Sequence, residues 1–181
     1  YVDQAYFGFE ADPIDVNYFV HRYDNVMFAR TFSKFFALAG LRLGYGVASK
    51  RALEALWLDL PLLRLPIIAR RAVIECLKDD GYYDGIRRTI HDVREWFYHE
   101  LLELENVHPY QSDTNFIYMK IIGVDAVTVR EEMIKKGYLY RIFEYNGEQF
   151  YRINVAPMET MRDFMNKFRQ TIDSVKKGAA N

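Results

Sequence analysis

Cysteine is almost absent from this sequence. Among its 181 residues there is one cysteine, Cys76. A lone cysteine excludes an internal disulfide and any zinc site built from cysteines. It lies at helical spacing in the segment RRAVIECLKDD, and we interpret it as a small core residue.

Long apolar runs and an excess of one charge are missing as well. No stretch reaches the ~18 apolar residues that a membrane span needs, and no secretory signal pattern is present. The 24 basic and 25 acidic residues give a formal net charge of −1, so no overall field attracts nucleic acid or a membrane. The 4 histidines lack metal-ligand spacing. We expect a cytoplasmic protein without a nucleic-acid partner, a membrane partner or a metal.

The first residues read as part of a strand that is already under way. The chain begins with Tyr1 rather than methionine, and YVDQAYFGF is typical of the end of a buried strand. Proteins rarely begin inside such a strand. We therefore expect this chain to be the C-terminal part of a longer protein.

Apolar runs bounded by turn residues predict the secondary structure. In the first part we expect a strand ending near residue 2, strands over 26–28 and 43–47, and helices over 52–60 and 67–77. Gly81 is expected to end the second helix, and a long amphipathic helix covers 83–104. The rest predicts strands over 115–121, 138–143 and 149–155, helices over 125–136 and 158–175, and a turn at Asn146-Gly147.

The stretch TFSKFFALAGLRLGYG, residues 31–46, places one lysine among small and apolar residues. Taken alone, Lys34 would be a solvated charge, but Phe32, Phe35 and Phe36 are expected to enclose its amine. Desolvation lowers the pKa of a lysine and makes it a nucleophile for a carbonyl. Arg42 offers a planar fork for a phosphate, and Ser33 adds a hydroxyl. One carbonyl and one phosphate on a single ligand describe pyridoxal 5′-phosphate.

Four motifs carry a resemblance to a known family. RTFSKFFALAGLRLGYG resembles the lysine motif of fold-type I pyridoxal-phosphate enzymes, in the class I/II aminotransferase branch, and is most similar there to the histidinol-phosphate aminotransferases. VDQAYFGFE resembles the Asp-x-Ala-Tyr motif of that group, QSDTNFIYMK its Asn-Phe strand, and LYRIFEYNGEQFYRINVA its ending with two arginines. The four motifs occur in the family's order and span nearly the whole chain.

The resemblance implies an α/β fold, namely the C-terminal part of a fold-type I transferase. Residues 1–62 would be the C-terminal part of the large cofactor-binding domain, with a remnant of its sheet. Residues 63–105 would be connecting helices, and residues 106–181 the small α+β domain.

The resemblance also implies roles for the residues that bind the cofactor. Lys34 would form the Schiff base with pyridoxal phosphate and then move the proton at the substrate's Cα. Asp3 would pair with the pyridinium nitrogen, and Tyr6 would donate to the phenolic oxygen. Ser33 and Arg42 would hold the phosphate. Taken alone, Asp3 would be a turn residue at a strand end and Tyr6 a half-buried aromatic.

Three further positions match residues that meet the substrate in the family. Asn115 and Arg152 would contact the substrate, with Arg152 gripping a carboxylate or another anion in a bidentate contact. Arg141 matches a second anion-binding position. An ordinary charge on a strand remains the alternative for both arginines.

The implied reaction is transamination between an L-amino acid, or an amino alcohol phosphate such as histidinol phosphate, and 2-oxoglutarate, in a homodimer. Alternatives are a threonine-phosphate decarboxylase-like enzyme, an aromatic or aspartate aminotransferase, and a non-catalytic relative of the same fold. The family's phosphate loop and ring-stacking aromatic precede its Asp-x-Ala-Tyr motif, and neither is in this sequence. We therefore expect the isolated chain to be inactive.

Overall fold

The structure is a computed structural model that describes residues 1–56 and 65–179. It divides into two compact units, Tyr1–Arg87 and Arg88–Asn181. The long helix α4, Asp80–Leu102, contributes residues to both units. None of the described helices is long and apolar enough to cross a membrane.

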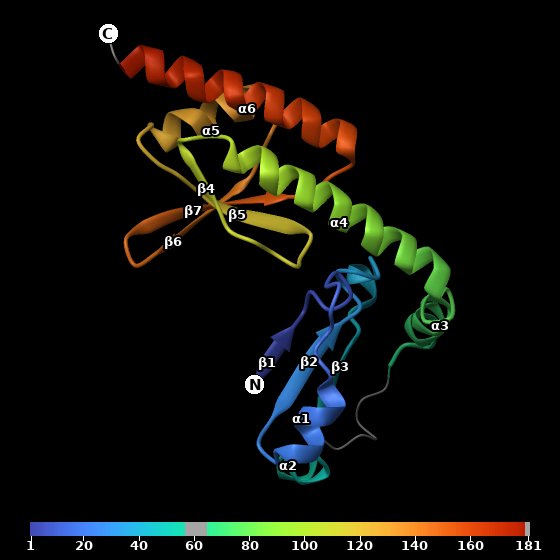
Figure 1. Ribbon diagram of the computed structural model, residues 1–181. Coiled ribbons are helices and arrows are strands. Elements are labelled where there is room, and N and C mark those ends of the chain that lie inside the picture. Colours follow the sequence, from blue (N-terminus) through green and yellow to red (C-terminus); the bar gives the residue numbers. More distant parts are fainter. Residues whose placement is uncertain (57–64, 180–181) are drawn as a thin grey trace. The chain divides into compact units, whose positions relative to one another are not determined.

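The first unit is built on a three-stranded sheet in the order β1-β2-β3 (Figure 1). Its strands are β1 Val2–Gln4, β2 Met27–Thr31 and β3 Gly44–Ala48. β1 runs parallel to β2, and β2 is antiparallel to β3. The three predicted strands are therefore present, with β2 extending further toward the lysine motif than the sequence indicated.

Among the described residues, the first unit also contains short helices, one 3-10 turn and the first residues of α4. The short elements are α1 Val16–Arg22, the 3-10 turn η1 Ala39–Leu41, α2 Lys50–Ala55 and α3 Ile67–Cys76. The carboxylate of Asp15 accepts hydrogen bonds at the start of α1, and the hydroxyl of Ser49 caps α2, as such residues commonly do. The predicted helix over 52–60 extends beyond the described residues, since 57–60 are outside them.

The prediction that Gly81 ends a helix is wrong. The break between helices lies before it, because α3 ends at Cys76 and α4 begins at Asp80. Asp79 accepts a hydrogen bond from the backbone N–H of Tyr82 at 3.2 Å, which satisfies one of the free donors of the first turn. A glycine within a first turn costs only about 1 kcal/mol relative to alanine, so the capping carboxylate sets the boundary.

The segment that follows β2 forms a small core with α3. Phe32 and Leu43 are buried together with Ala69 of α3, and partly buried apolar side chains surround them: Phe36, Leu38, Leu41 and Val73. The apolar residues of the lysine motif thus pack into the first unit, which fixes the backbone on which Lys34 and Arg42 stand.

The second unit is an antiparallel sheet with helices packed on it. Its strand order is β4-β5-β7-β6, with β4 Val107–Pro109, β5 Phe116–Ile121, β6 Arg141–Tyr145 and β7 Glu148–Asn154. Helices α5, Ala126–Lys135, and α6, Met158–Ala179, follow the predicted positions. β4 was not predicted, because three residues are too short to show a period.

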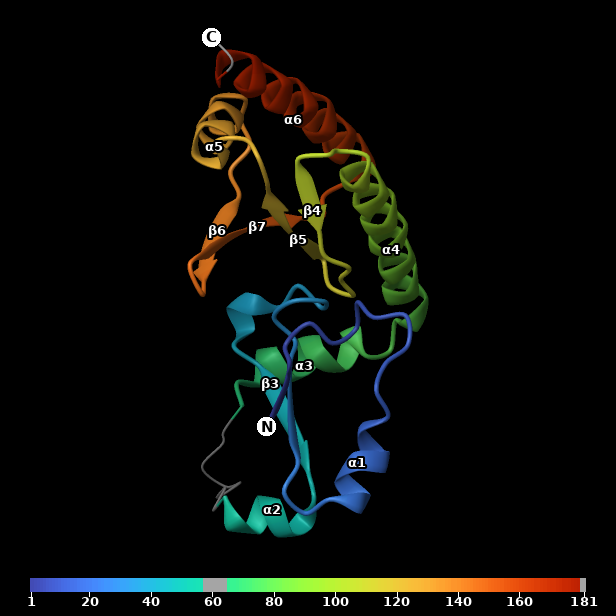
Figure 2. The ribbon, with the colours of Figure 1, turned by 60° about the vertical axis from the view of Figure 1, so that its left-hand side comes forward.

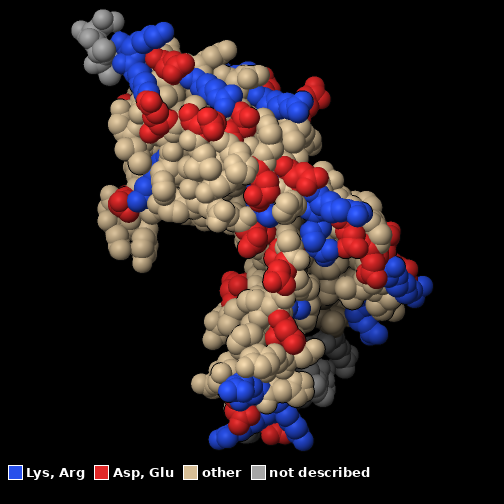
Figure 3. All heavy atoms as spheres, in the orientation of Figure 1, with Lys and Arg blue, Asp and Glu red and all other residues tan. Residues whose placement is uncertain are grey.

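The core of the second unit lies between one face of this sheet and the helices α4, α5 and α6 (Figure 2). Alternate strand residues point into it, and so do helix residues at three- and four-residue spacing. The largest contributors are Phe97, Leu101, Ile117, Met119, Met133, Tyr151, Met161, Met165 and Phe168. Figure 3 shows acidic and basic side chains next to one another along α6. In the same helix, Asp163 and Lys167 form an ion pair at 2.7 Å. The described residues on the other face of the sheet do not contribute to this core.

Candidate active site

Two of the predicted motifs meet at one edge of the first sheet. Because β1 and β2 are parallel, the residues that follow both strands lie at the same edge, where α/β sheets bind ligands. Asp3 and Tyr6 come from β1 and the turn after it, and Lys34 comes from the segment after β2. The Nζ atom of Lys34 lies 5.7 Å from the centroid of the Tyr6 ring. The carboxylate of Asp3 accepts the backbone N–H of Ala5 at 2.8 Å.

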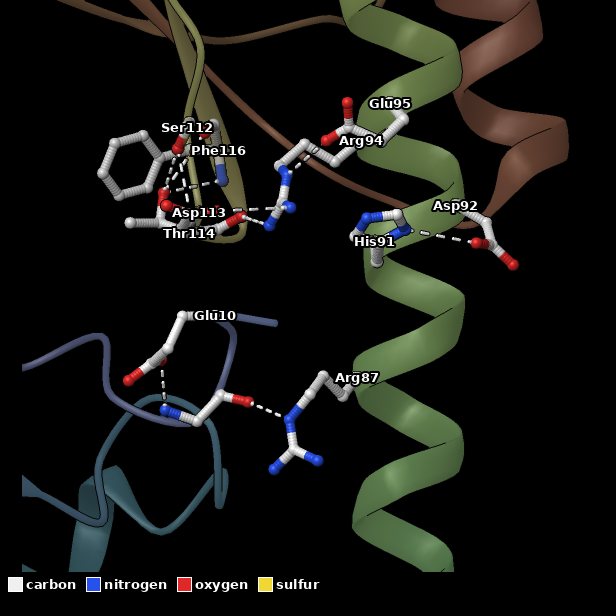
Figure 4. A network of polar contacts seen from close by, with 11 residues as sticks. Glu10, Arg87, His91, Asp92, Arg94, Glu95, Ser112, Asp113, Thr114 and Phe116 are labelled. Carbon is white, nitrogen blue, oxygen red and sulfur yellow. Dashed lines mark hydrogen bonds and ion pairs between the residues drawn. The ribbon is translucent and has the colours of Figure 1, made fainter. Parts of the chain in front are cut away.

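Gly8 brings the turn after β1 against the lysine motif. Its φ of +104° lies in the region that favours glycine, and a Cβ on it would come within 2.4 Å of Phe35 Cδ1. The carbonyl of Gly8 accepts a hydrogen bond from Arg87 Nε at 2.8 Å, and its N–H donates to Glu10 at 2.7 Å (Figure 4). The close approach of this turn to Phe35 places Tyr6 beside Lys34.

Two hydroxyl groups gather where β2 ends. The hydroxyl oxygen of Thr31 lies 2.9 Å from that of Ser33 and accepts the backbone N–H of Ser33 at 3.1 Å. It also lies 3.1 Å from the carbonyl oxygen of Leu43, to which it donates. Sequence reasoning missed Thr31. Its only signal was a hydroxyl residue two positions before Ser33.

Arg42 reaches the same edge from β3. Gly44 pairs with Thr31 in the antiparallel ladder, so the residues just before Gly44 lie level with the end of β2. Arg42 has a φ of 54°, and its guanidinium donates to the carbonyl of Ala39 at 2.8 Å. The side chain is exposed, which leaves the rest of its planar fork accessible to an anion.

The expected enclosure of Lys34 by aromatic rings is wrong for this chain. Lys34 is exposed, whereas Phe32 and Phe35 are 8% and 5% exposed and belong to the interior. β2 is soon followed by a turn, in which the N–H of Ala37 donates to the carbonyl of Lys34. Within such a turn neighbouring side chains point in different directions, so the rings pack inward and the amine points outward.

In the second unit, the strand register brings the two arginines together. Arg141 lies directly opposite Arg152 in the β6–β7 ladder, and Tyr118 lies opposite Arg152 on the other side. Residues directly opposite in a ladder share one face of the sheet. The buried neighbours Tyr151 and Ile153 point into the core, so the arginines occupy the face away from the helices. The guanidinium of Arg152 lies 3.8 Å from the centroid of the Phe116 ring.

Lys120 is a third cation on this face, and sequence reasoning missed it. Phe116, Tyr118 and Lys120 are two residues apart along β5, so their side chains lie on the same face of the sheet. The amine of Lys120 contacts Glu148 at 2.7 Å and lies 4.8 Å from the centroid of the Phe150 ring. The hydrogen bond to Glu148 raises the pKa of Lys120. Strand alternation from Phe116 onward was the signal that could have found it.

Asn115 immediately precedes β5. Its backbone carbonyl accepts the N–H of Val155 at 2.8 Å, which joins the start of β5 to the end of β7. Its side-chain oxygen is buried and has no hydrogen-bond partner among the described residues. A buried amide oxygen without a partner is costly and suits a donor supplied by a ligand.

The candidates thus divide by unit. Asp3, Tyr6, Ser33, Lys34 and Arg42 all belong to the first unit, where they share one edge of the sheet. Asn115, Arg141 and Arg152 belong to the second, where the two arginines share a face of the sheet.

A comparison with known families decides the assignment. The profile of the family described as Aminotransferase class I and II matches residues 1–168. This chain belongs to the class I and II aminotransferases. The histidinol-phosphate aminotransferase of Methanocaldococcus jannaschii is 28% identical over 174 residues, which cover 94% of this chain and 47% of that protein. The chain therefore spans about half the length of this relative.

Solved aminotransferase structures share the fold. The histidinol-phosphate aminotransferase from Clostridium acetobutylicum superposes with a TM-score of 0.82 at 21% identity, covering 95% of this chain and 54% of that one. The Sinorhizobium meliloti enzyme of the same name, solved in complex with pyridoxal-5′-phosphate, gives a TM-score of 0.75 at 25% identity over 95% of this chain and 48% of that one. The predicted α/β fold of this aminotransferase class is confirmed.

Proposed function

We propose that the complete protein transfers an amino group between 2-oxoglutarate and an L-amino acid or an amino alcohol phosphate that resembles histidinol phosphate. The observation that carries this proposal is the pairing of Arg141 with Arg152 on one face of the second sheet. Two arginines at directly opposite positions of the ladder suit a substrate with an anionic group at each end, such as a dicarboxylate or an amino acid that also bears a phosphate.

The residues of the first unit fit pyridoxal 5′-phosphate by the chemistry of their donors. An amine for its aldehyde, a hydroxyl and a guanidinium for its phosphate, a carboxylate for its ring nitrogen and a phenol for its ring oxygen lie at one sheet edge. When bound, this cofactor supplies an electron sink for the reaction at the substrate's Cα. The similarity to a family member solved with that cofactor supports the assignment.

Each side chain then has a defined task. Lys34 provides the amine that attaches the cofactor covalently, and its Nζ moves the proton at the substrate's Cα. Asp3 holds the proton on the pyridine nitrogen, and Tyr6 donates its hydroxyl to the ring oxygen. Ser33 and Arg42 bind the phosphate.

The second unit supplies the contacts to the substrate. In this proposal Arg152 binds its carboxylate, Arg141 binds the second anion and Asn115 accepts a hydrogen bond. Residues 1–62 then belong to the large cofactor-binding domain, 63–105 to connecting helices and 106–181 to the small domain. The working form would be a homodimer in the cytoplasm.

Substitution of the two arginines tests the proposal. Arg152→Lys should raise KM for 2-oxoglutarate at least about tenfold, since an ammonium lacks the planar fork of a guanidinium. Arg141→Ala should change the ratio of kcat/KM between histidinol phosphate and glutamate. Steady-state kinetics with 2-oxoglutarate, histidinol phosphate, glutamate and phenylalanine measure both effects.

Arg162→Lys, at an exposed position of α6, serves as the matched control and should leave both parameters unchanged. An unchanged KM in Arg152→Lys would remove its carboxylate role. An unchanged donor ratio in Arg141→Ala would leave that residue an ordinary strand charge.

A further inference from the structure

Arg94 is a buried charge that the reaction proposed above does not use. It lies on α4 within the second unit, and only 2% of its surface is exposed. A guanidinium taken out of water needs charged and hydrogen-bonding partners to offset its lost hydration. The partners of Arg94 therefore show what its burial achieves.

The partners of Arg94 are the next residue of α4 and the segment before β5. Its Nε donates to Glu95 at 3.2 Å, and one terminal nitrogen donates to the backbone carbonyl of Thr114 at 3.1 Å. The other terminal nitrogen lies 3.8 Å from a carboxylate oxygen of Asp113. Figure 4 shows the side chain extending from α4 to this segment. Two of its three partners thus belong to the turn that leads into Asn115.

That turn is ordered by its own hydrogen bonds as well. The N–H of Thr114 donates to the hydroxyl of Ser112 at 3.1 Å, and the N–H of Phe116 donates to the hydroxyl of Thr114 at 3.3 Å. The carbonyl of Asn115 accepts the N–H of Val155 at 2.8 Å. The backbone of Asn115 is therefore held on both sides, by Arg94 at the preceding carbonyl and by the end of β7 at its own.

We propose that Arg94 is a positioning residue that fixes the direction of the Asn115 side chain. The peptide that joins Thr114 to Asn115 carries the carbonyl that Arg94 binds, so holding this carbonyl sets the orientation of the peptide and of the Cα that follows. The buried, unpartnered amide oxygen of Asn115 is then held ready for a ligand donor. The link to substrate binding rests on the proposed function, whereas the positioning itself does not.

The positioning is tested by NMR of the complete protein with ¹⁵N-labelled asparagine. The side-chain amide signals of Asn115 are identified as those missing from Asn115→Ala. Arg94→Met keeps an unbranched apolar chain in the buried site but removes the donors, and it should shift or broaden these signals. Arg94→Lys keeps the charge without the planar fork and should move them by less. If Arg94→Met does not fold, Arg94→Lys still tests the proposal.

Arg169→Met is the matched control, because it removes a different ion pair of the same unit, with Glu100 at 2.6 Å. It should lower the unfolding temperature while leaving the Asn115 signals in place. Asn115 signals at their wild-type positions in both Arg94 variants would overturn the proposal, whatever the activity of the protein.

A double-mutant cycle tests whether this positioning matters for substrate. Arg94→Met should raise KM for glutamate about tenfold when Asn115 is present, but less than about twofold in the Asn115→Ala background, because residues that act together are not additive. Equal effects in both backgrounds would show that Arg94 acts elsewhere. An unchanged KM in Asn115→Ala would end the substrate role of Asn115, while the amide signals would still decide whether Arg94 positions it.

Discussion

Lys34 is distinguished by the groups around it and not by burial. Lys34 is exposed in this chain, yet its amine lies beside the Tyr6 ring and it directly follows Ser33, whose hydroxyl pairs with that of Thr31. The exposed Lys50, in contrast, stands 3.8 Å from Glu54 across one turn of α2, a pair of a kind that contributes little. The chemical neighbourhood, and not desolvation, therefore marks Lys34 as the candidate nucleophile.

Replacing Lys34 tests this directly. In the complete protein, Lys34→Ala should abolish both transamination and the covalent attachment of cofactor after borohydride reduction, because it removes the amine assigned to the cofactor's aldehyde. Mass spectrometry of the reduced protein measures the attachment, and Lys50→Ala should retain it. Normal turnover by Lys34→Ala would show that the assignment is wrong.

At the scale of elements, the site of the first unit depends on the turn after β1. The backbone of Gly8 lies close to the Phe35 ring, and Phe9 adds an edge-to-face contact with that ring at 5.1 Å between centroids. Arg87 of α4 binds the carbonyl of Gly8. Gly8 therefore lies where the end of β1, the lysine motif and the beginning of α4 come together.

Gly8→Ala should therefore destabilise the protein by about 2 kcal/mol or more, from a strained positive φ and from overlap with Phe35. Gly40→Ala is a sharp control, because among the described residues no atom beyond its chain neighbours and local backbone lies within 4 Å of the position its Cβ would take. Its stability should be unchanged or slightly higher. Urea-induced unfolding of the two variants measures the difference. Equal stabilities would mean that the turn yields without strain.

At the scale of the whole molecule, the chain spans about half of its relative from M. jannaschii. The first unit places five candidate groups at one sheet edge, but Lys34, Arg42 and Asp3 are all exposed there. An exposed anion site is weakened by competition with water, because charges interact much less strongly in a high dielectric.

We therefore expect purified residues 1–181 alone to bind pyridoxal phosphate weakly and to show no transamination above the rate of the free cofactor. Absorbance titration gives the affinity, and a coupled glutamate assay gives the rate. The complete protein, assayed in parallel, should turn over. Robust turnover by the purified chain would show that these residues suffice.

The sequence by itself determined the fold class and the identity of the candidate residues. Strand and helix positions followed from the apolar period, and the four motifs carried the family, because both are local patterns of neighbouring residues. The same local reasoning failed at Gly81, where the capping carboxylate of Asp79 decides the helix start. It failed again at Lys34, where the turn directs the rings inward and the amine outward.

Only the tertiary structure decided which residues face one another. That Arg141 stands opposite Arg152 depends on the register of two strands, and a shift of one residue would turn either side chain to the other face. The contact between Arg94 and the carbonyl of Thr114 joins residues with no shared motif. The Asn146-Gly147 turn predicted from the sequence left the first pairing conditional on the strand register. The second contact was not visible in the sequence, because long-range packing is set by the whole core of the second unit and not by the residues concerned.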